Sequence, residues 1–433
     1  MKAENSGFDQ FAGLKSAWLR LNGVLWSDVE PVQGQRDWSV LTDLEHCILE
    51  AAQLNAEVIL VVRKTPLWAQ KDEGYYCGPV HEDKLDEFGD FLHALVGRYS
   101  APPYNVKYWE IGNEPDVDPG LSDFWGPDVP FGCWGDESDE YYGGGYFAEM
   151  LKAVYPRIKA ADPQSKVLIG GLLMNCDPRS YCTPDDKPVE YQPTQFLKGI
   201  LHNGGGGYFD VVAFHAYDYY YGDRGQYGYF KWESQWDKNG PLLVAKAGYI
   251  KEVLASYQIF DKGLMSTEMA LICGDYDDPP GLAGCESDWD SPYESTKASY
   301  VAQTYAAAIA EGVDAGIWYR VDGWRNSGLL YEDLSARPAF LAMQFAYDVF
   351  SGSDFDGKIT STDVDGLGNV FGYKFSRGER RIWIIWSLDE QPRQLSPPGE
   401  PLAMWNVLGE QIEIGNAGEL NLSLEPVYIE WSP

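Results

Sequence analysis

The chain has 433 residues, of which 45% are hydrophobic and 23% are charged, so it can bury a large core and wholesale disorder is excluded. Its formal net charge of −33 repels nucleic-acid phosphates. No apolar run reaches the ~20 residues that span a bilayer. We therefore expect neither a nucleic-acid nor a membrane partner.

Short apolar runs alternate with helical patterns over the first 350 residues. The runs lie at 17–23, 57–62, 106–112, 166–171, 210–217, 263–271 and 315–321. Near-continuous apolar strands separated by helices are typical of a parallel sheet covered by helices. Seven repeats predict a (β/α)8 TIM barrel whose first strand is missing or atypical. No glycine-rich phosphate motif follows the first run, which counts against a dinucleotide cofactor.

The pattern changes at about residue 355. Segments such as RRIWIIWSL alternate apolar and polar residues with period two, and turn residues separate them. This alternation predicts a small antiparallel β-sandwich. We place the (β/α)8 catalytic barrel at 1–352, ending in a helix at 336–350, and the C-terminal β-sandwich domain at 353–433.

Three loops that follow predicted strands are unusually long. They lie at 116–145, 218–241 and 272–295 and are rich in Tyr, Trp, Asp and Gly. In a barrel such loops build the C-terminal face, where active sites lie. The chain has 16 Trp and 29 Tyr, and exposed aromatic faces bind the apolar faces of ring-shaped ligands, including sugars.

The cysteines indicate an oxidising compartment. Cys176 and Cys182 flank one loop rich in Asp and Pro, Cys273 and Cys285 flank another, and Cys77 and Cys133 remain to pair across two loops. Cys47 lies in a helical pattern and is predicted to be a buried free thiol. The alternative is a set of unpaired cytosolic thiols. A zinc site is disfavoured because there is no CxxC motif, and we expect no metal.

The start of the chain, MKAENSGFDQ, is polar and lacks the apolar stretch of a secretory signal. If the protein is exported, as the cysteines indicate, the signal has been removed. We therefore expect an extracellular or periplasmic location.

Two strand ends carry carboxylates. YWEIGNEPDV places Glu114 at the end of the third apolar run, and STEMAL places Glu268 at the end of the sixth. Strands three apart on a small barrel direct their ends across one pocket. Two carboxylates that face each other suit glycoside hydrolysis, with one as acid and base and the other as nucleophile. The acid requires a raised pKa, which burial and the charge of the other carboxylate would give.

With these motifs the chain resembles the clan A glycoside hydrolases, most closely family 39 and its neighbours, over roughly residues 10–430. The resemblance implies that Glu114 is the acid/base and Glu268 the nucleophile of a retaining enzyme, and that no cofactor takes part. In this clan the two residues end strands four and seven. Only two runs precede Glu114 here, where three are expected. We therefore expect that Met1 is not the natural start and that the first strand precedes it, or that something else closes the gap.

The resemblance also assigns residues that bind substrate. Asn113 would hydrogen-bond the sugar 2-OH, and Arg20 would orient the nucleophile. His215 and Tyr217 would lie near the two glutamates, and Trp318 would form the floor of the sugar subsite. Each has a structural alternative: a strand-end histidine for His215, barrel core for Trp318 and an ion pair for Arg20.

Further candidates for substrate contact are Lys64, Arg320 and Trp324. Cations at the mouth of an acidic protein could bind a uronate or a sulfate, although such residues more often pair with nearby Asp and Glu. We predict an exo-acting β-glycosidase that resembles a β-xylosidase, with a carbohydrate as its partner. The alternatives are an endo-acting β-glycanase and a non-catalytic carbohydrate-binding protein on the same scaffold.

Overall fold

The structure is a computed structural model. It describes residues 8–14, 17–120, 129–175, 177, 192–229, 232, 240–274, 285–389, 392–414 and 419–432. Cys176 and Cys182, predicted to form a disulfide, lie outside this part of the chain.

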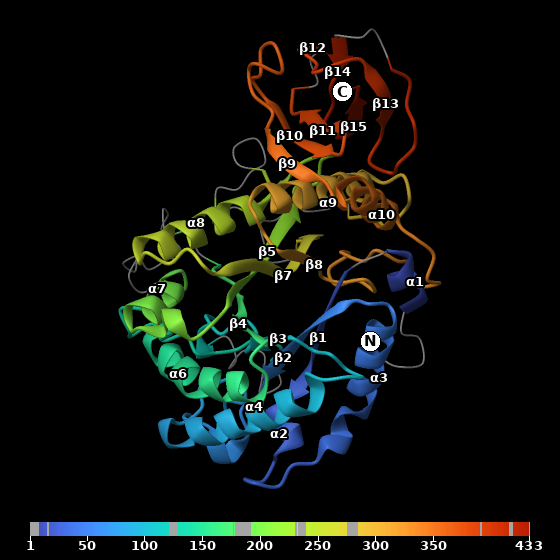
Figure 1. The fold of residues 1–433 in the computed structure, drawn as a ribbon. Coiled ribbons are helices and arrows are strands. Elements are labelled where there is room, and N and C mark those ends of the chain that lie inside the picture. The colour runs from blue at the N-terminus through green and yellow to red at the C-terminus, as the bar shows by residue number, and fades with distance from the viewer. Residues whose placement is uncertain are drawn as a thin grey trace. The chain divides into compact units, whose positions relative to one another are not determined.

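The strands and helices of the first 350 residues follow the predicted alternation (Figure 1). The strands are β1 (Trp18–Leu25), β2 (Glu57–Arg63), β3 (Tyr108–Ile111), β4 (Lys166–Leu172), β5 (Val211–Tyr220), β6 (Tyr227–Gly228), β7 (Gly263–Ile272) and β8 (Ala315–Trp318). The helices are α1 (Phe8–Gly13), α2 (Trp26–Val29), α3 (Thr42–Gln53), α4 (Leu85–Tyr99), α6 (Gly144–Ala161), α7 (Gln195–His202), α8 (Leu242–Ser256), α9 (Pro292–Ala310) and α10 (Pro338–Phe350).

Local sequence explains where these elements form. In β2 the apolar run from Val58 to Val62 is wholly buried, as expected for a strand covered on both faces. Helix α4 has acidic residues in its first turn and Arg98 in its last, which complements the helix dipole. Helix α9 begins after Ser291, whose hydroxyl accepts the Glu294 N–H, and has Pro292 at its first position.

The sheet has the order β1-β2-β3-β4-β5-β7-β8, and β6 pairs with β5. The pairs from β1 to β5 are parallel, so consecutive carboxyl ends meet at one edge. The predicted (β/α)8 architecture is confirmed, since parallel strands alternate with helices along the chain. Ahead of β1, residues 8–13 form α1 rather than a strand.

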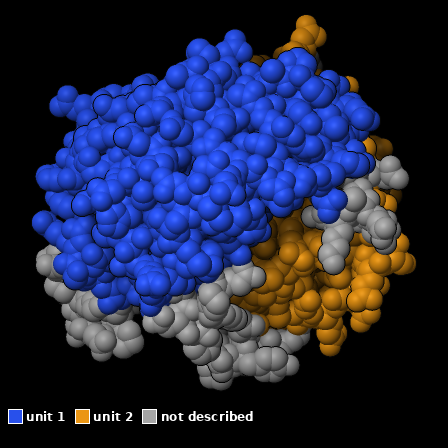
Figure 2. Space-filling view, turned by 90° about the horizontal axis from the view of Figure 1, so that it is seen from below, with its two compact units in different colours: residues 1–8, 16–216, 246–268 blue, residues 9–15, 217–245, 269–433 orange. Residues whose placement is uncertain are grey.

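The chain divides into two compact units (Figure 2). Unit 1 comprises residues 1–8, 16–216 and 246–268, and unit 2 comprises residues 9–15, 217–245 and 269–433. In unit 1 the helices α3, α4, α6 and α7 lie outside strands β1–β4 (Figure 1). The predicted division at 352/353 stays a prediction.

Unit 2 contains the antiparallel part of the chain. Its strands are β9 (Asp354–Lys358), β10 (Val370–Arg377), β11 (Arg380–Ser387), β12 (Pro392–Gln394), β13 (Pro401–Trp405), β14 (Glu419–Asn421) and β15 (Val427–Trp431). Five form a sheet with the order β13-β15-β11-β10-β9, and β12 pairs with β14. One face of the larger sheet packs on α9 and α10, with Phe375 and Tyr428 among the buried residues. The other face, which includes Trp383 and Trp431, covers a second core.

Within the described ranges, no helix combines the length and the apolar character needed to cross a membrane.

Candidate active site

Glu114 lies three residues after the last residue of β3, in a backbone conformation that few side chains adopt. Its φ is +50°, and its N–H donates to Gly171 O at 3.1 Å. Gly112, two residues earlier, has φ +86°. A non-glycine residue in the left-handed region costs free energy, so the surrounding contacts must impose it. The chain therefore turns sharply at the strand end and presents the Glu114 carboxylate at the carboxyl edge of the sheet.

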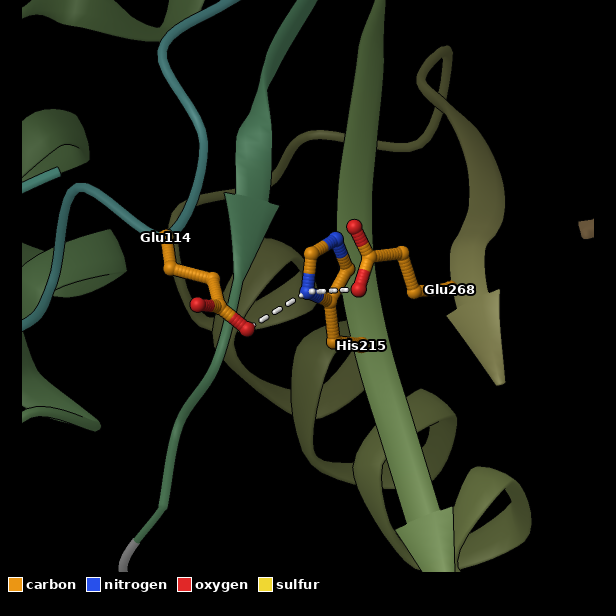
Figure 3. A group of neighbouring side chains, drawn as sticks. All are labelled: Glu114, His215 and Glu268. Atoms are coloured by element: carbon orange, nitrogen blue, oxygen red, sulfur yellow. Dashed lines mark hydrogen bonds and ion pairs between the residues drawn. The ribbon is translucent and has the colours of Figure 1, made fainter. Parts of the chain in front are cut away.

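His215 of β5 lies between Glu114 and Glu268 of β7 (Figure 3). Its Nδ1 is 2.8 Å from Glu114 Oε1 and 3.5 Å from Glu268 Oε2. One ligand atom from each of these residues lies within 4.8 Å of the others. The two carboxylates thus meet across one imidazole, as their positions at strand ends predict.

Gly171 of β4 makes this approach sterically feasible. A Cβ added at this position would lie 2.1 Å from His215 Nε2 and 2.8 Å from Thr267 Oγ1. Any side chain there would displace the imidazole, so the site requires glycine at this point of β4.

Arg20 of β1 contacts three side chains of the site: Glu110, Asn113 and Glu268. Its Nη1 donates to Glu268 Oε1 at 2.5 Å, and its Nε and Nη2 donate to the two oxygens of Glu110 at 2.9 and 2.8 Å. Arg20 Nη2 also donates to Asn113 Oδ1 at 2.6 Å. The two hydrogen bonds to Glu110 fix the orientation of the guanidinium, so the nitrogen that contacts Glu268 is held in place.

Glu110 belongs to this cluster of charged side chains, and sequence reasoning missed it. It is fully buried on β3, where the Gly171 N–H donates to its Oε1 at 2.7 Å. The available signal was a charged residue inside the apolar run YWEIG, on the strand face opposite Trp109. A buried carboxylate requires a partner, and Arg20 is that partner.

The electrostatics favour a protonated Glu114. Burial raises the pKa of Glu114 to about 7, Arg20 and Lys246 oppose the rise, and Glu110 adds to it. Burial is thus the main cause of the raised pKa of Glu114, as expected, and the carboxylate of Glu110 adds to it. Burial also lowers the pKa of His215 to about 4, so its imidazole is neutral near pH 7. A neutral ring bridges the carboxylates without forcing Glu114 to ionise.

Asn113 and Lys64 border a pocket in unit 1. Asn113 Nδ2 donates to Pro130 O at 3.0 Å, which engages one of its two amide hydrogens. Lys64 is half-buried and has φ +63°. The pocket is lined by these two residues and by aromatic side chains that include Trp26, Phe131 and Trp134.

The other predicted residues lie in unit 2. Tyr217 is buried, and its ring meets those of Tyr319 and Trp324 edge-on, at centroid distances of 6.2 and 5.4 Å. Trp324 is 40% exposed. Arg320 Nε lies 2.6 Å from Asp322 Oδ1, which matches the local ion pair considered as its alternative role.

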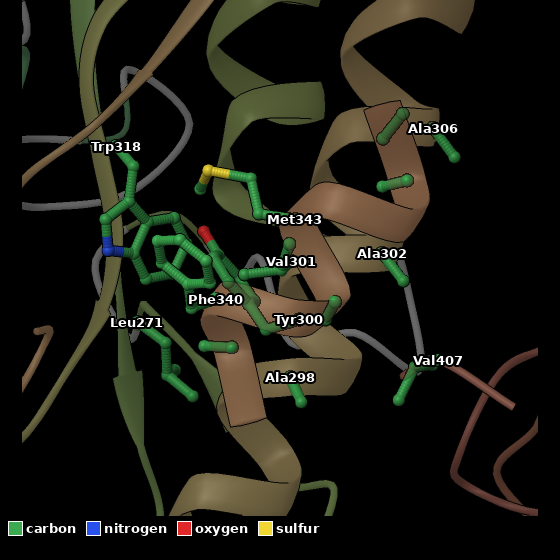
Figure 4. Packing of buried hydrophobic residues seen from close by; sticks show 14 of the residues in the cluster. Leu271, Ala298, Tyr300, Val301, Ala302, Ala306, Trp318, Phe340, Met343 and Val407 are labelled. Carbon is green, nitrogen blue, oxygen red and sulfur yellow. The ribbon is translucent and has the colours of Figure 1, made fainter. Parts of the chain in front are cut away.

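Trp318 lies in the hydrophobic core of unit 2. Its side chain is 7% exposed and faces α9 and α10, next to Tyr300, Phe340 and Met343 (Figure 4). Its Nε1 donates to Ser327 O at 2.9 Å. This placement matches the barrel-core alternative considered for Trp318.

Two of the predicted disulfides are present. Cys77 and Cys133 join the loops after β2 and β3, and Cys273 and Cys285 close a loop after β7. Cys47 is a buried free thiol in α3, as predicted. The expected pair Cys176 and Cys182 remains a prediction.

Glu114, His215 and Glu268 are also the residues in the described ranges whose atoms could surround a metal ion. Arg20 already contacts Glu268 Oε1 at 2.5 Å, so a positive charge occupies one side of this group. The arrangement suits proton transfer by one carboxyl group and nucleophilic attack on a substrate by the other.

Solved structures share this fold. A family 39 glycoside hydrolase from the gut symbiont Bacteroides cellulosilyticus WH2 is 17% identical with a TM-score of 0.70, covering 99% of this chain and 78% of its own. A family 30 endoxylanase from Clostridium papyrosolvens C71 is 12% identical with a TM-score of 0.57, covering 100% and 94%. A family 51 α-L-arabinofuranosidase from Bifidobacterium longum is 13% identical with a TM-score of 0.55, covering 98% and 89%.

At the level of fold, the resemblance to clan A glycoside hydrolases is confirmed. No family model and no curated protein matches the sequence.

Proposed function

We propose that the protein is a retaining glycoside hydrolase, with Glu114 as acid/base and Glu268 as nucleophile. The observation that carries the proposal is the pair of carboxylates at strand ends, joined through one imidazole with their atoms within 4.8 Å. Retaining enzymes place their carboxyl groups about 5–5.5 Å apart, whereas inverting enzymes need room for a water molecule between them.

The first step uses both carboxylates at once. The Glu268 oxygen attacks the anomeric carbon, the glycosidic C–O bond breaks, and Glu114 gives its proton to the leaving oxygen. The raised pKa of Glu114, about 7 because of burial, keeps this proton available at neutral pH. Arg20, at 2.5 Å, holds the Glu268 carboxylate in place for attack.

The second step reverses the roles. Glu268 is now an ester and carries no charge, so the pKa of Glu114 falls and its carboxylate can accept a proton from water. The water oxygen bonds to the anomeric carbon, and the ester bond to Glu268 breaks. The sugar leaves with its original anomeric configuration.

For the substrate, we propose an exo-acting β-glycosidase that resembles a β-xylosidase, because the closest motif resemblance is to family 39. An endo-acting β-glycanase is the alternative, and the test below distinguishes the two. The disulfides Cys77–Cys133 and Cys273–Cys285 support activity in an oxidising compartment, outside the cell or in the periplasm.

The test is hydrolysis of a panel of aryl β- and α-glycosides, uronides included, and of defined xylo-oligosaccharides. Glu268→Gln should lose turnover by about 10⁴-fold or more, because the nucleophile is gone. Glu114→Gln should lose about 10²–10⁴-fold, and least on aryl glycosides whose leaving group needs no proton. Release of single sugars from chain ends would indicate exo action.

The matched control is Glu149→Gln. Glu149 is exposed on α6 and pairs with Lys152, so the same chemical change leaves the site intact. Sugar affinity that persists with no turnover in the unmodified protein would support the non-catalytic binding alternative and contradict the proposal.

A further inference from the structure

Lys246 of α8 is a buried lysine beneath the acid/base. It is 2% exposed, and its Nζ donates to two backbone carbonyls: Leu173 O at 2.5 Å and His215 O at 2.8 Å. Leu173 directly follows β4, and His215 belongs to β5. One ammonium group thus joins the chain just after β4 to the middle of β5.

Asp116 also hydrogen-bonds the backbone just after β4. Its two carboxylate oxygens accept the N–H groups of Leu173 and Met174 at 2.8 and 2.7 Å. The Leu173 residue is therefore held by Asp116 at its N–H and by Lys246 at its carbonyl. Because Glu114 lies two residues before Asp116 and donates its own N–H to Gly171, this network fixes where Glu114 meets His215.

The charge of Lys246 also needs an explanation. Carboxylates near a buried ammonium group offset part of the cost of burying its charge. Burial raises the pKa of Glu114 to about 7 and that of Asp116 to about 6, and the positive charge of Lys246 opposes both rises. Lys246 thus acts on the proton of the acid/base as well as on its position.

Several charged or titratable groups face Glu114, and each comes from a different element. They are Arg20 from β1, Glu110 from β3, Asp116 from the loop after β3, His215 from β5, Glu268 from β7 and Lys246 from α8. Arg20 is already shared by Glu110 and Glu268. Lys246 is the second cation that acts on Glu114.

We propose that Lys246 is a positioning residue for the acid/base. It holds the backbone at Leu173 and His215, and so fixes the contact between the Glu114 and His215 side chains. Its buried charge also sets the upper pH limit of turnover. The inference rests on the proposed function. The positioned group, Glu114, can nevertheless be observed without turnover, through the chemical shift of its carboxyl carbon.

The experiment compares Lys246→Met, Lys246→Gln and Lys246→Arg in the full chain. The Glu114 carboxyl is titrated by ¹³C NMR, assigned with Glu114→Gln, and kcat/KM is measured against pH. Loss of the charge in the Met and Gln variants should move the Glu114 titration, and the alkaline limb of kcat/KM, to higher pH by about one unit. Gln keeps hydrogen-bond donors without charge, so it serves if Met prevents folding. Arg keeps the charge and should restore the original midpoint.

Lys297→Met is the matched control. Lys297 is also fully buried and also donates to two backbone carbonyls, Asn326 O and Gly328 O, both at 2.9 Å. Its loss should lower stability without moving the Glu114 titration. An unchanged midpoint in folded Lys246→Gln, or an equal shift in Lys297→Met, would overturn the inference. A shifted carboxyl titration in a protein with no turnover on any sugar would support it while rejecting the proposed function.

Discussion

Two buried ion clusters use the same residue types in opposite proportions. In unit 1 a single cation, Arg20, is shared by two carboxylates, Glu110 and Glu268. In unit 2 a single carboxylate, Glu294, is shared by two cations, Lys297 at 2.9 Å and Arg337 at 2.6 Å.

The proportions decide which cluster can react. In unit 2 both cations contact Glu294 Oε1, and Lys297 further donates to Asn326 O and Gly328 O, so that cluster secures a loop. In unit 1 the pKa of Glu114 is raised to about 7, chiefly by burial, and the neighbouring carboxylate of Glu110 adds to the rise. A cluster short of positive charge can hold a transferable proton, whereas a cluster rich in it is structural.

Removing the shared cation should have the largest effect. Arg20→Met leaves Glu110 and Glu268 buried without their cation, which should lower the free energy of unfolding by about 3–5 kcal/mol. Turnover should fall by at least about 100-fold because the nucleophile loses its fixed position. Chemical denaturation and kcat/KM measure the two effects. The control is Arg157→Met, which removes ion pairs with Asp86 and Asp90. Because the Arg157 side chain is 42% exposed, its loss should lower the free energy of unfolding by less than about 1 kcal/mol. Equal costs would contradict the account.

Removing the shared carboxylate should destabilise without changing the chemistry. Glu294→Gln leaves Lys297 and Arg337 as buried cations, and we expect unfolding to become easier by about 3 kcal/mol. The alkaline limb of the pH–rate profile should stay in place. The double variant with Lys297→Met should lose less than the two single losses added, because it removes a charge that the first change left unpaired. Strict additivity in denaturation experiments would show that the pair does not couple.

The smallest effect concerns stability against pH. Because the folded pKa of Glu114 is raised from 4.5 to about 7, the folded state binds the proton more tightly than the unfolded chain. Stability from this group is therefore present at low pH and is lost as pH rises from about 4.5 to 7. Glu114→Gln should match the unmodified protein at pH 4 and exceed it by up to about 3 kcal/mol at pH 8. Urea denaturation across this range measures the difference in unfolding free energy from the unmodified protein. For Glu149→Gln this difference should not change with pH.

Much of the fold follows from the spacing of apolar residues. The runs predicted at 57–62, 166–171 and 263–271 became β2, β4 and β7 with end shifts of a residue or so, because buried parallel strands must be apolar throughout. The predicted last barrel helix at 336–350 appears as α10, Pro338–Phe350. The short strand β6 was not predicted, since two residues carry no period.

The site was predictable only where residues lie at strand ends. Glu114, His215 and Glu268 come together because parallel strands bring their carboxyl ends to one edge. Glu110 and Lys246 were missed because a charge inside a strand or a helix reveals its partner only after folding. The direction of Trp318 depends on the pleat of a four-residue strand, which is too short for alternation to fix a face.

The most direct test of the central claim is to trap the covalent intermediate on Glu268. Glu114→Ala, incubated with an aryl glycoside that has a good leaving group, should form the glycosyl-enzyme quickly and hydrolyse it slowly. Intact-protein mass spectrometry should show the addition of one glycosyl residue, and peptide analysis should place it on Glu268. Turnover with no adduct and an inverted anomeric product, or an adduct on another residue, would contradict the account.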